Sequence, residues 1–189
     1  MVKHWQKRNS YKHGDFRVFQ VREDESVSPR TGKAHNFYIL EADNWANIIP
    51  VTKEGNVVLI HQYRHGTERV EVEIPGGVVD PTDESPLVGA ERELLEETGY
   101  GAEKIIQIGE VAPNPAILDN RCYTFLALGA TWQRTPEFDG SEDIVVEEVP
   151  LVEIPSLIQA GKISHALVVA AFYFFDQYRR EHPDWFELG

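Results

Sequence analysis

Residues 75–100 read PGGVVDPTDESPLVGAERELLEETGY, and this stretch decides the fold. Its acidic residues are crowded together, and this crowding needs a physical reason. From Asp80 to Glu103 the chain carries eight acidic residues against one basic residue, Arg92. Like charges three or four positions apart on a helix cost ~0.2–0.5 kcal/mol per pair. The helix macrodipole also disfavours anions near a helix C-terminus, where Glu96 and Glu97 fall. A sequence that breaks two local rules at one place predicts a functional site.

The same stretch predicts a helix whose two ends are marked. Ser85 is a suitable N-cap, and Pro86 is favoured at the first helical position. Gly99 is a natural C-terminal stop. The apolar side of this helix is formed by Leu87, Ala90, Leu94 and Leu95. We therefore expect a helix that packs on one side and presents its carboxylates on the other.

Three of these glutamates have the spacing of a metal site. Glu93 lies three residues before Glu96 and four before Glu97, so the three side chains project near one another on a helix. Carboxylate oxygens crowded in this way suit Mg²⁺ or Mn²⁺. The alternative is a solvated acidic face, but the Pro-Gly-Gly sequence upstream, the capped start and the apolar side all weigh against it. The pattern predicts a divalent-cation site.

The stretch resembles the Nudix box, Gly-x5-Glu-x7-Arg-Glu-U-x-Glu-Glu-x-Gly-U, where U is a bulky apolar residue. Glu84, the seven residues after it and RELLEETGY (residues 92–100) match this pattern. Six residues instead of five separate Gly77 from Glu84, which we interpret as a one-residue loop insertion around Asp80-Pro81. The resemblance implies an α/β (α+β) Nudix fold, with a mixed β-sheet between helices.

Further motifs are similar to one branch of this family, the ADP-ribose and nucleoside-diphosphate-sugar pyrophosphatases. They are QYR (residues 62–64), EIPGG (73–77) and APNPA (112–116). That branch tends to carry a proline at a fixed distance after the box, and Pro115 follows Tyr100 by fifteen residues. The segment GSEDIVVEEVPLVEI (140–154) resembles its acidic loop and the strand after it.

The resemblance and the charge pattern together assign roles around a bound Mg²⁺ or Mn²⁺. The expected metal ligands are Glu93, Glu96, Glu97 and a backbone carbonyl at Gly76 or Gly77. Arg92 is expected to hold carboxylates of the box, within reach of Glu96. The general base is expected to be either Glu93 or Glu142, and the alternative for Glu142 is an ordinary loop acid.

The expected substrate-binding residues lie outside the helix. Arg64 ends a strand next to the site, and Arg69 precedes the strand that leads into Pro75. Either side chain can clamp a phosphate bidentately or form a surface ion pair. Trp45 is expected to stack on a nucleobase or to pack in the core. Glu73 and Pro115 complete the set through the EIPGG and APNPA motifs.

Composition excludes several classes of partner. The formal net charge is −13, so binding to nucleic acid is not expected, because Lys and Arg dominate affinity for phosphate backbones. The most apolar segment, Ala166–Phe175, is ten residues long and too short to span a bilayer. Cys122 is the one cysteine, so an intrachain disulfide is impossible and a reducing, cytoplasmic location is expected.

Hydrophobic patterns and turn residues predict the remaining elements. An N-terminal hairpin is expected from strands at Phe16–Glu23 and Asn36–Glu41, with Pro29 and Gly32 in its turn. Further strands are expected at 47–52, 57–64, 70–74, 105–111, 121–128 and 143–151, and further helices at 154–160 and 165–180. Because a lone hairpin is marginal in water, residues 1–44 are expected to form a dimerisation subdomain and residues 45–189 the catalytic domain.

The resulting functional expectation is metal-dependent hydrolysis of the pyrophosphate bond of nucleoside diphosphate sugars. ADP-ribose, cleaved to AMP and ribose 5-phosphate, is the leading substrate, and GDP-mannose or ADP-glucose are also expected to fit. Alternative substrates are dinucleoside polyphosphates, coenzyme A and oxidised nucleotides, and an alternative reaction is isopentenyl diphosphate isomerisation. A Nudix domain that senses nucleotides without catalysis is the alternative outside enzymes.

Overall fold

The computed structural model describes residues 1–138, 140 and 143–184, and the chain divides into two compact units. The first unit comprises Met1–Asn44 together with Ala112–Arg121. The second unit comprises Trp45–Val111 and the chain from Cys122 onward. The polypeptide therefore passes from the first unit to the second, returns for ten residues, and enters the second unit again.

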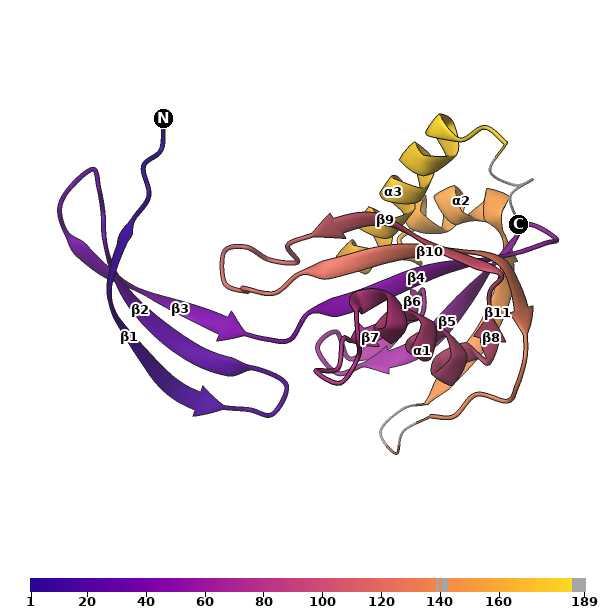
Figure 1. Ribbon diagram of the computed structural model, residues 1–189, viewed down its shortest axis with the longest axis horizontal. Coiled ribbons are helices and arrows are strands. Elements are labelled where there is room, and N and C mark those ends of the chain that lie inside the picture. Colours follow the sequence, from indigo (N-terminus) through magenta and orange to yellow (C-terminus); the bar gives the residue numbers. More distant parts are fainter. Residues whose placement is uncertain (139, 141–142, 185–189) are drawn as a thin grey trace. The chain divides into compact units, whose positions relative to one another are not determined.

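The first unit is built on a three-stranded antiparallel sheet in the order β1-β2-β3 (Figure 1). Its strands are β1 (Gln6–Asp15), β2 (Gln20–Val27) and β3 (Ala34–Glu41). The expected hairpin corresponds to β2 and β3, and β1 was not predicted, so the expectation of two strands is wrong. The sequence of β1, QKRNSYKHGD, has no apolar alternation that would indicate a strand.

A buried carboxylate joins the first two strands. Asp24 accepts hydrogen bonds from Ser10 Oγ at 2.6 Å and Arg22 Nε at 3.1 Å, and it pairs with Lys7 Nζ at 3.0 Å. Burial alone would raise the pKa of Asp24, but the hydrogen bonds of Ser10 and Lys7 and the nearby positive charges outweigh it and lower that pKa. This sheet is therefore held by polar contacts more than by an apolar core.

Residues 112–121 bind the end of the third strand. The Leu40 N–H donates to the Ile117 carbonyl at 2.7 Å, and the Ala42 N–H donates to Asp119 Oδ1 at 3.3 Å. The segment turns at Asn114, whose carbonyl accepts from the Leu118 N–H at 2.8 Å. It thereby becomes part of the first unit, although the sequence places it between two strands of the second.

The second unit contains an eight-stranded mixed sheet, whose central path is β11-β5-β4-β10-β8. Strands β4 and β10 are parallel, and the other pairs are antiparallel. The strands are β4 (Trp45–Thr52), β5 (Asn56–Arg64), β6 (Arg69–Glu73), β7 (Gly76–Val78), β8 (Tyr100–Gly101), β9 (Lys104–Val111), β10 (Cys122–Trp132) and β11 (Ile144–Pro150).

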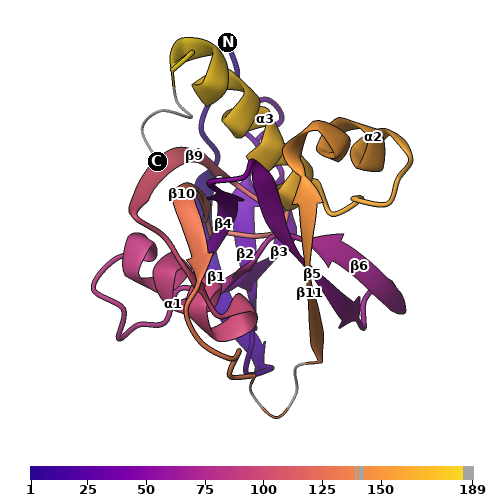
Figure 2. The same ribbon diagram turned by 90° about the vertical axis from the view of Figure 1, so that its right-hand side faces the viewer.

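Helices cover both faces of this sheet (Figures 1 and 2). On one face, α1 (Pro86–Thr98) buries Ala90 and Leu94 against β4 and β10. On the other face lie α2 (Ile154–Gln159) and α3 (Ala166–Glu181), with the 3-10 turn Leu151–Glu153 before them. The larger core on that side includes Ile49, Leu59, Leu126, Val168, Phe172 and Phe175. The expected mixed sheet between helices is confirmed.

The boundaries of α1 agree with the predicted caps. Ser85 Oγ accepts a hydrogen bond from the Val88 N–H at 3.4 Å, and Pro86 begins the helix. Gly99 has φ of 73°, a left-handed conformation that favours glycine. Its carbonyl accepts hydrogen bonds from the N–H groups of Gln133 and Arg134, so the chain after β10 closes the helix end.

Two short strands of the second unit were not predicted. Strand β7 has three residues and β8 has two, so neither is long enough to produce a recognisable sequence pattern. Helix α3 packs on the sheet through Val168, Phe172 and Phe175, while Tyr173 on the same helix is 63% exposed. Among the described residues, no helix is long and apolar enough to cross a membrane.

Candidate active site

The carboxylates of α1 lie against the backbone of β7. The Gly76 N–H donates a hydrogen bond to Glu97 Oε2 at 2.8 Å, and Glu97 is only 3% exposed. A Cβ atom placed on Gly77 would lie 2.5 Å from Glu93 Oε1, so any side chain at this position would displace the carboxylate. The two glycines therefore let two helical carboxylates approach the strand closely.

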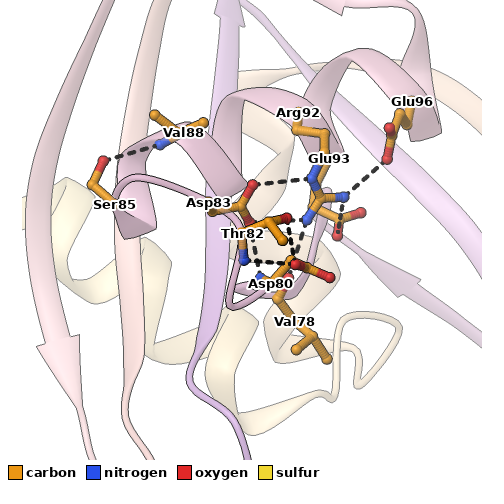
Figure 3. Close-up of polar contacts among 9 residues, drawn as sticks. All are labelled: Val78, Asp80, Thr82, Asp83, Ser85, Val88, Arg92, Glu93 and Glu96. Carbon is orange, nitrogen blue, oxygen red and sulfur yellow. Dashed lines mark hydrogen bonds and ion pairs between the residues drawn. The ribbon is translucent and has the colours of Figure 1, made fainter.

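Arg92 organises the exposed side of this centre (Figure 3). Its Nη1 donates to Glu93 Oε1 at 3.0 Å and to Glu96 Oε2 at 2.9 Å. Its Nη2 donates to the Val78 carbonyl at 3.2 Å and to Asp83 Oδ2 at 3.3 Å. Burial opposes the charged guanidinium, but the hydrogen bonds and charges of these carboxylates outweigh it and raise the pKa of Arg92. Arg92 thus remains a cation that fixes the acids around it.

In the structure, Asp83 takes the position that the sequence analysis gave to Glu84, the first acid of the box. Counted from Gly77, Asp83 is the residue that follows five intervening positions. Asp83 contacts Arg92 and is buried, whereas Glu84 is exposed. A turn precedes it, in which the Asp83 N–H donates to the Asp80 carbonyl at 2.9 Å. The assignment of Glu84 is therefore corrected: the first acid is Asp83, and the extra residue lies between it and Arg92.

A cavity of about 610 Å³ adjoins the same glycines. Gly76 and Gly77 form part of its wall, so the backbone that contacts the α1 carboxylates also faces this space. The expected substrate-binding residues in its lining are Trp45, Arg64, Arg69 and Glu73. Cys122 also lines the cavity, and burial raises the pKa of its thiol to about 12, as expected for an unreactive thiol.

Both arginines of the cavity are bound to carboxylates of β6. Arg64 donates to Glu73 in a bidentate pair, from Nε to Oε1 at 2.8 Å and from Nη2 to Oε2 at 2.9 Å. Arg69 Nε donates to Glu71 Oε1 at 2.7 Å. Burial would raise the pKa of Glu73, but the hydrogen bonds and charges of His165 and Arg64 outweigh it and lower that pKa to about 2. Glu73 therefore stays ionised and fixes its arginine.

Ser164 and His165 belong to this arrangement and were not predicted. Ser164 Oγ donates to Glu71 Oε2 at 2.9 Å and accepts from Arg69 Nη2 at 3.0 Å. His165 Nδ1 lies 2.9 Å from Glu73 Oε2. These residues are 92 or 93 positions from the carboxylates that they contact. No local pattern indicates such a pairing, because the fold of the whole second unit creates it.

Two expected site residues fall outside the described part of the second unit. Pro115 belongs to the first unit and is exposed in the turn that starts at Asn114. Glu142 lies outside the residues that the structure describes. Of the two candidates for the general base, the structure describes Glu93 alone, with its carboxylate 13% exposed beside Gly77.

The donor groups around Gly76 and Gly77 fit a hard divalent cation. In the described ranges, no three His, Cys, Asp or Glu side chains converge to enclose a metal ion. Mg²⁺ is commonly bound by one or two carboxylates, with water and substrate phosphates as its other ligands. Glu97 and Glu93, together with a backbone carbonyl of Gly76, suit that mode. The glycine backbone leaves the space that close approach of these oxygens requires.

Comparisons with known proteins agree with this geometry. The model of the NUDIX domain matches residues 44–172. An ADP-ribose pyrophosphatase of Bacillus subtilis is 32% identical, over 79% of this chain and 81% of the relative. A GDP-mannose pyrophosphatase of Yersinia pestis is 27% identical, over 93% and 89%. A crystal structure of an ADP compounds hydrolase aligns with a TM-score of 0.84 and 21% identity, over 96% of this chain and 97% of that one, and shows the same fold.

These matches confirm the resemblance drawn from the sequence, including the ADP-ribose pyrophosphatase branch. Nudix hydrolases generally depend on a divalent metal ion, in line with the carboxylates that α1 presents to β7. Both the family model and the B. subtilis relative span the box, the cavity arginines and the sheet that carries them. The chain belongs to the NUDIX family.

Proposed function

We propose that this chain hydrolyses the pyrophosphate bond of nucleoside diphosphate sugars, with ADP-ribose cleaved to AMP and ribose 5-phosphate. One observation supports this most strongly: Gly76 and Gly77 contact the acidic face of α1 and also line a cavity that contains two arginines. Such a site can take a metal on one side and substrate phosphates on the other. The ADP-ribose pyrophosphatase and GDP-mannose pyrophosphatase names of the relatives favour the same class of substrate.

The proposed cofactor is Mg²⁺, or Mn²⁺ in its place, held by Glu97, Glu93 and Glu96 with the Gly76 carbonyl. When bound, the ion supplies charge neutralisation at the phosphates and lowers the pKa of the attacking water. Its ligands need a fixed geometry, and Arg92 provides it through its bonds to Glu93 and Glu96. Proton removal from the water falls to Glu93 or to Glu142.

The protein residues around the cavity hold the substrate. Arg64 and Arg69 present guanidinium groups to the phosphates, and the bidentate bond to Glu73 fixes the orientation of Arg64 before substrate arrives. Trp45 offers a stacking surface for a base or sugar at the cavity wall. Stacking alone discriminates little between bases, so GDP-mannose and ADP-glucose are proposed as further substrates.

We also propose that the first unit mediates a homodimer and that the protein works in the cytoplasm. Its sheet leaves large aromatic side chains exposed on both faces: Tyr11 and Tyr38, each at 57%, on one face and Phe37 at 42% on the other. A second copy of the chain can cover one face of this sheet, because three strands with a polar core bury little apolar surface by themselves. The single buried cysteine is consistent with a reducing compartment. We propose that residues 1–44 mediate dimerisation and that residues 45–189 carry out catalysis.

A substrate panel tests the proposed function directly. The values of kcat/KM with Mg²⁺ should be higher for ADP-ribose and GDP-mannose than for diadenosine polyphosphates and coenzyme A, because the cavity fits one sugar-linked diphosphate. Products separated by chromatography should be AMP and ribose 5-phosphate from ADP-ribose. Higher efficiency on either of the last two classes than on both sugar nucleotides would place the chain in another branch. Absence of turnover on the whole panel would favour a sensing role.

The metal centre is tested by Glu97→Gln, with Glu91→Gln as its control. Loss of the Glu97 charge should lower kcat at least about 100-fold at saturating Mg²⁺. The free energy of unfolding without metal should be unchanged or slightly higher, because a like-charge contact is relieved and the amide oxygen can still accept from Gly76. Glu91 is exposed on the same helix, so its variant should keep kcat within about twofold. Full activity of Glu97→Gln, or of the wild type in excess chelator, would exclude this site.

The corrected position of the first acid is tested by a pair of neighbouring substitutions. Asp83→Asn removes a charged partner of Arg92 and should lower kcat about tenfold, since one charge-assisted hydrogen bond is worth ~1.5–3 kcal/mol. Glu84→Gln changes an exposed side chain and should stay within about twofold of the wild type. Steady-state kinetics with ADP-ribose distinguish the two, and the reverse order of effects would restore Glu84 to the box.

The dimer is tested by light scattering at micromolar concentration. The intact chain should have twice the mass of a 21.5 kDa protomer. Tyr38→Glu places a charge on the face of the first unit that carries Tyr11 and Tyr38, and it should yield a monomer. Tyr173→Glu alters an exposed aromatic residue of the second unit and should leave the dimer intact. A monodisperse wild-type monomer would refute the proposal.

A further inference from the structure

The cavity exposes its nitrogen-bearing side chains and buries its carboxylates. The side chains of Arg64, Arg69 and His165 are 40%, 59% and 40% exposed, whereas those of Glu73 and Glu71 are 4% and 7% exposed. A ligand in the cavity therefore meets guanidinium and imidazole edges first. The two arginines and two glutamates of the lining balance in formal charge, but the exposed charges are the positive ones, in a chain whose net charge is −13. The surface of this part of the cavity suits an anion.

His165 has one ring nitrogen bound and one available. Because Glu73 is an ionised carboxylate and can only accept, the hydrogen on His165 Nδ1 must donate to its Oε2, 2.9 Å away. This bond fixes the orientation of the ring, as carboxylates commonly do for functional histidines. Within the part of the chain that the structure describes, Nε2 has no hydrogen bond or ion pair, and the side chain lines the cavity.

We propose that His165 is a substrate-binding residue that, with both ring nitrogens protonated when the diphosphate is bound, donates from Nε2 to a phosphate oxygen beside Arg64 while Nδ1 donates to Glu73. Glu73 then holds both side chains at once: its Oε1 and Oε2 accept from Arg64, and its Oε2 also accepts from His165. The same cavity reaches Gly76 and Gly77, so a diphosphate engaged there lies next to the acidic face of α1. This inference rests on the proposed function, because it assigns the residue to that substrate.

Two substitutions separate the nitrogen atoms of the ring. His165→Asn keeps an N–H near the position of Nδ1, so the bond to Glu73 is retained while the Nε2 donor is lost. His165→Gln keeps an N–H near the position of Nε2 and loses the bond to Glu73. For a charge-assisted contact to phosphate we expect the Asn variant to raise KM for ADP-ribose about tenfold, with kcat changed less than about threefold. The Gln variant should keep KM within about threefold.

Direct binding supplies a readout that does not depend on turnover. Calorimetry with ADP-ribose in excess chelator should show Kd about tenfold weaker for His165→Asn and near the wild-type value for His165→Gln. His61→Asn is the control, because His61 is also paired with a glutamate, Glu147, but lies outside the cavity lining. It should leave both KM and Kd unchanged. Thermal unfolding checks that each variant is folded.

The outcomes separate this inference from the proposed function. An Asn variant with wild-type KM and Kd would overturn the role of His165 while the wild type still hydrolysed ADP-ribose. A Gln variant as weak as the Asn variant would overturn the assignment of the contact to Nε2. Failure of the wild type to hydrolyse ADP-ribose or GDP-mannose would instead refute the function on which the inference rests.

Discussion

The close approach of α1 to the backbone of β7 is the contact on which the rest of the site depends. A Cβ atom at Gly76 would lie 2.4 Å from the Ala46 carbonyl oxygen, and one at Gly77 would collide with Glu93. Because both positions are glycines, β7 can pair with β4 along one edge, and the Gly76 N–H donates a hydrogen bond to the buried Glu97. A buried carboxylate is tolerated only when hydrogen bonds replace its water. The Gly76 N–H supplies one to Glu97, and Arg92 supplies others to Glu93 and Asp83, so backbone geometry and charge are satisfied together.

The distribution of arginine explains how so acidic a chain can receive an anionic substrate. Each of these two arginines is bound to at least one carboxylate that is more buried than itself: Arg92 to Asp83, and Arg64 to Glu73. The buried acids hold the guanidinium groups in fixed orientations, while the exposed edges of those groups face outward. Orientation before binding reduces the entropy that a ligand must remove from the protein. The guanidinium groups exposed at this site therefore carry the sign opposite to the net charge of the chain.

Sequence reasoning succeeded where the signal is local and failed where it is not. The caps at Ser85 and Gly99 and the spacing of the glutamates are short-range features, and α1 and its acidic face follow from them. Strand β1 was missed because its polar sequence has no period of two, and its partners are other polar strands. Asp83 and Glu84 are adjacent acids, and only the direction of the side chains decides between them. His165 reaches Glu73 across 92 residues, which no window of sequence can reveal.

The return of the chain to the first unit has a consequence for protein engineering. Because residues 112–121 bind the end of β3, the small sheet is not a detachable N-terminal tail. A chain shortened to begin at Trp45 would keep that ten-residue excursion while losing the strand that satisfies its polar groups. A clean separation must instead replace residues 112–121 with a short turn that joins β9 directly to β10, which are already antiparallel neighbours. The first unit thus consists of two separate segments of sequence. Recombination at a single junction would transfer one segment without the other.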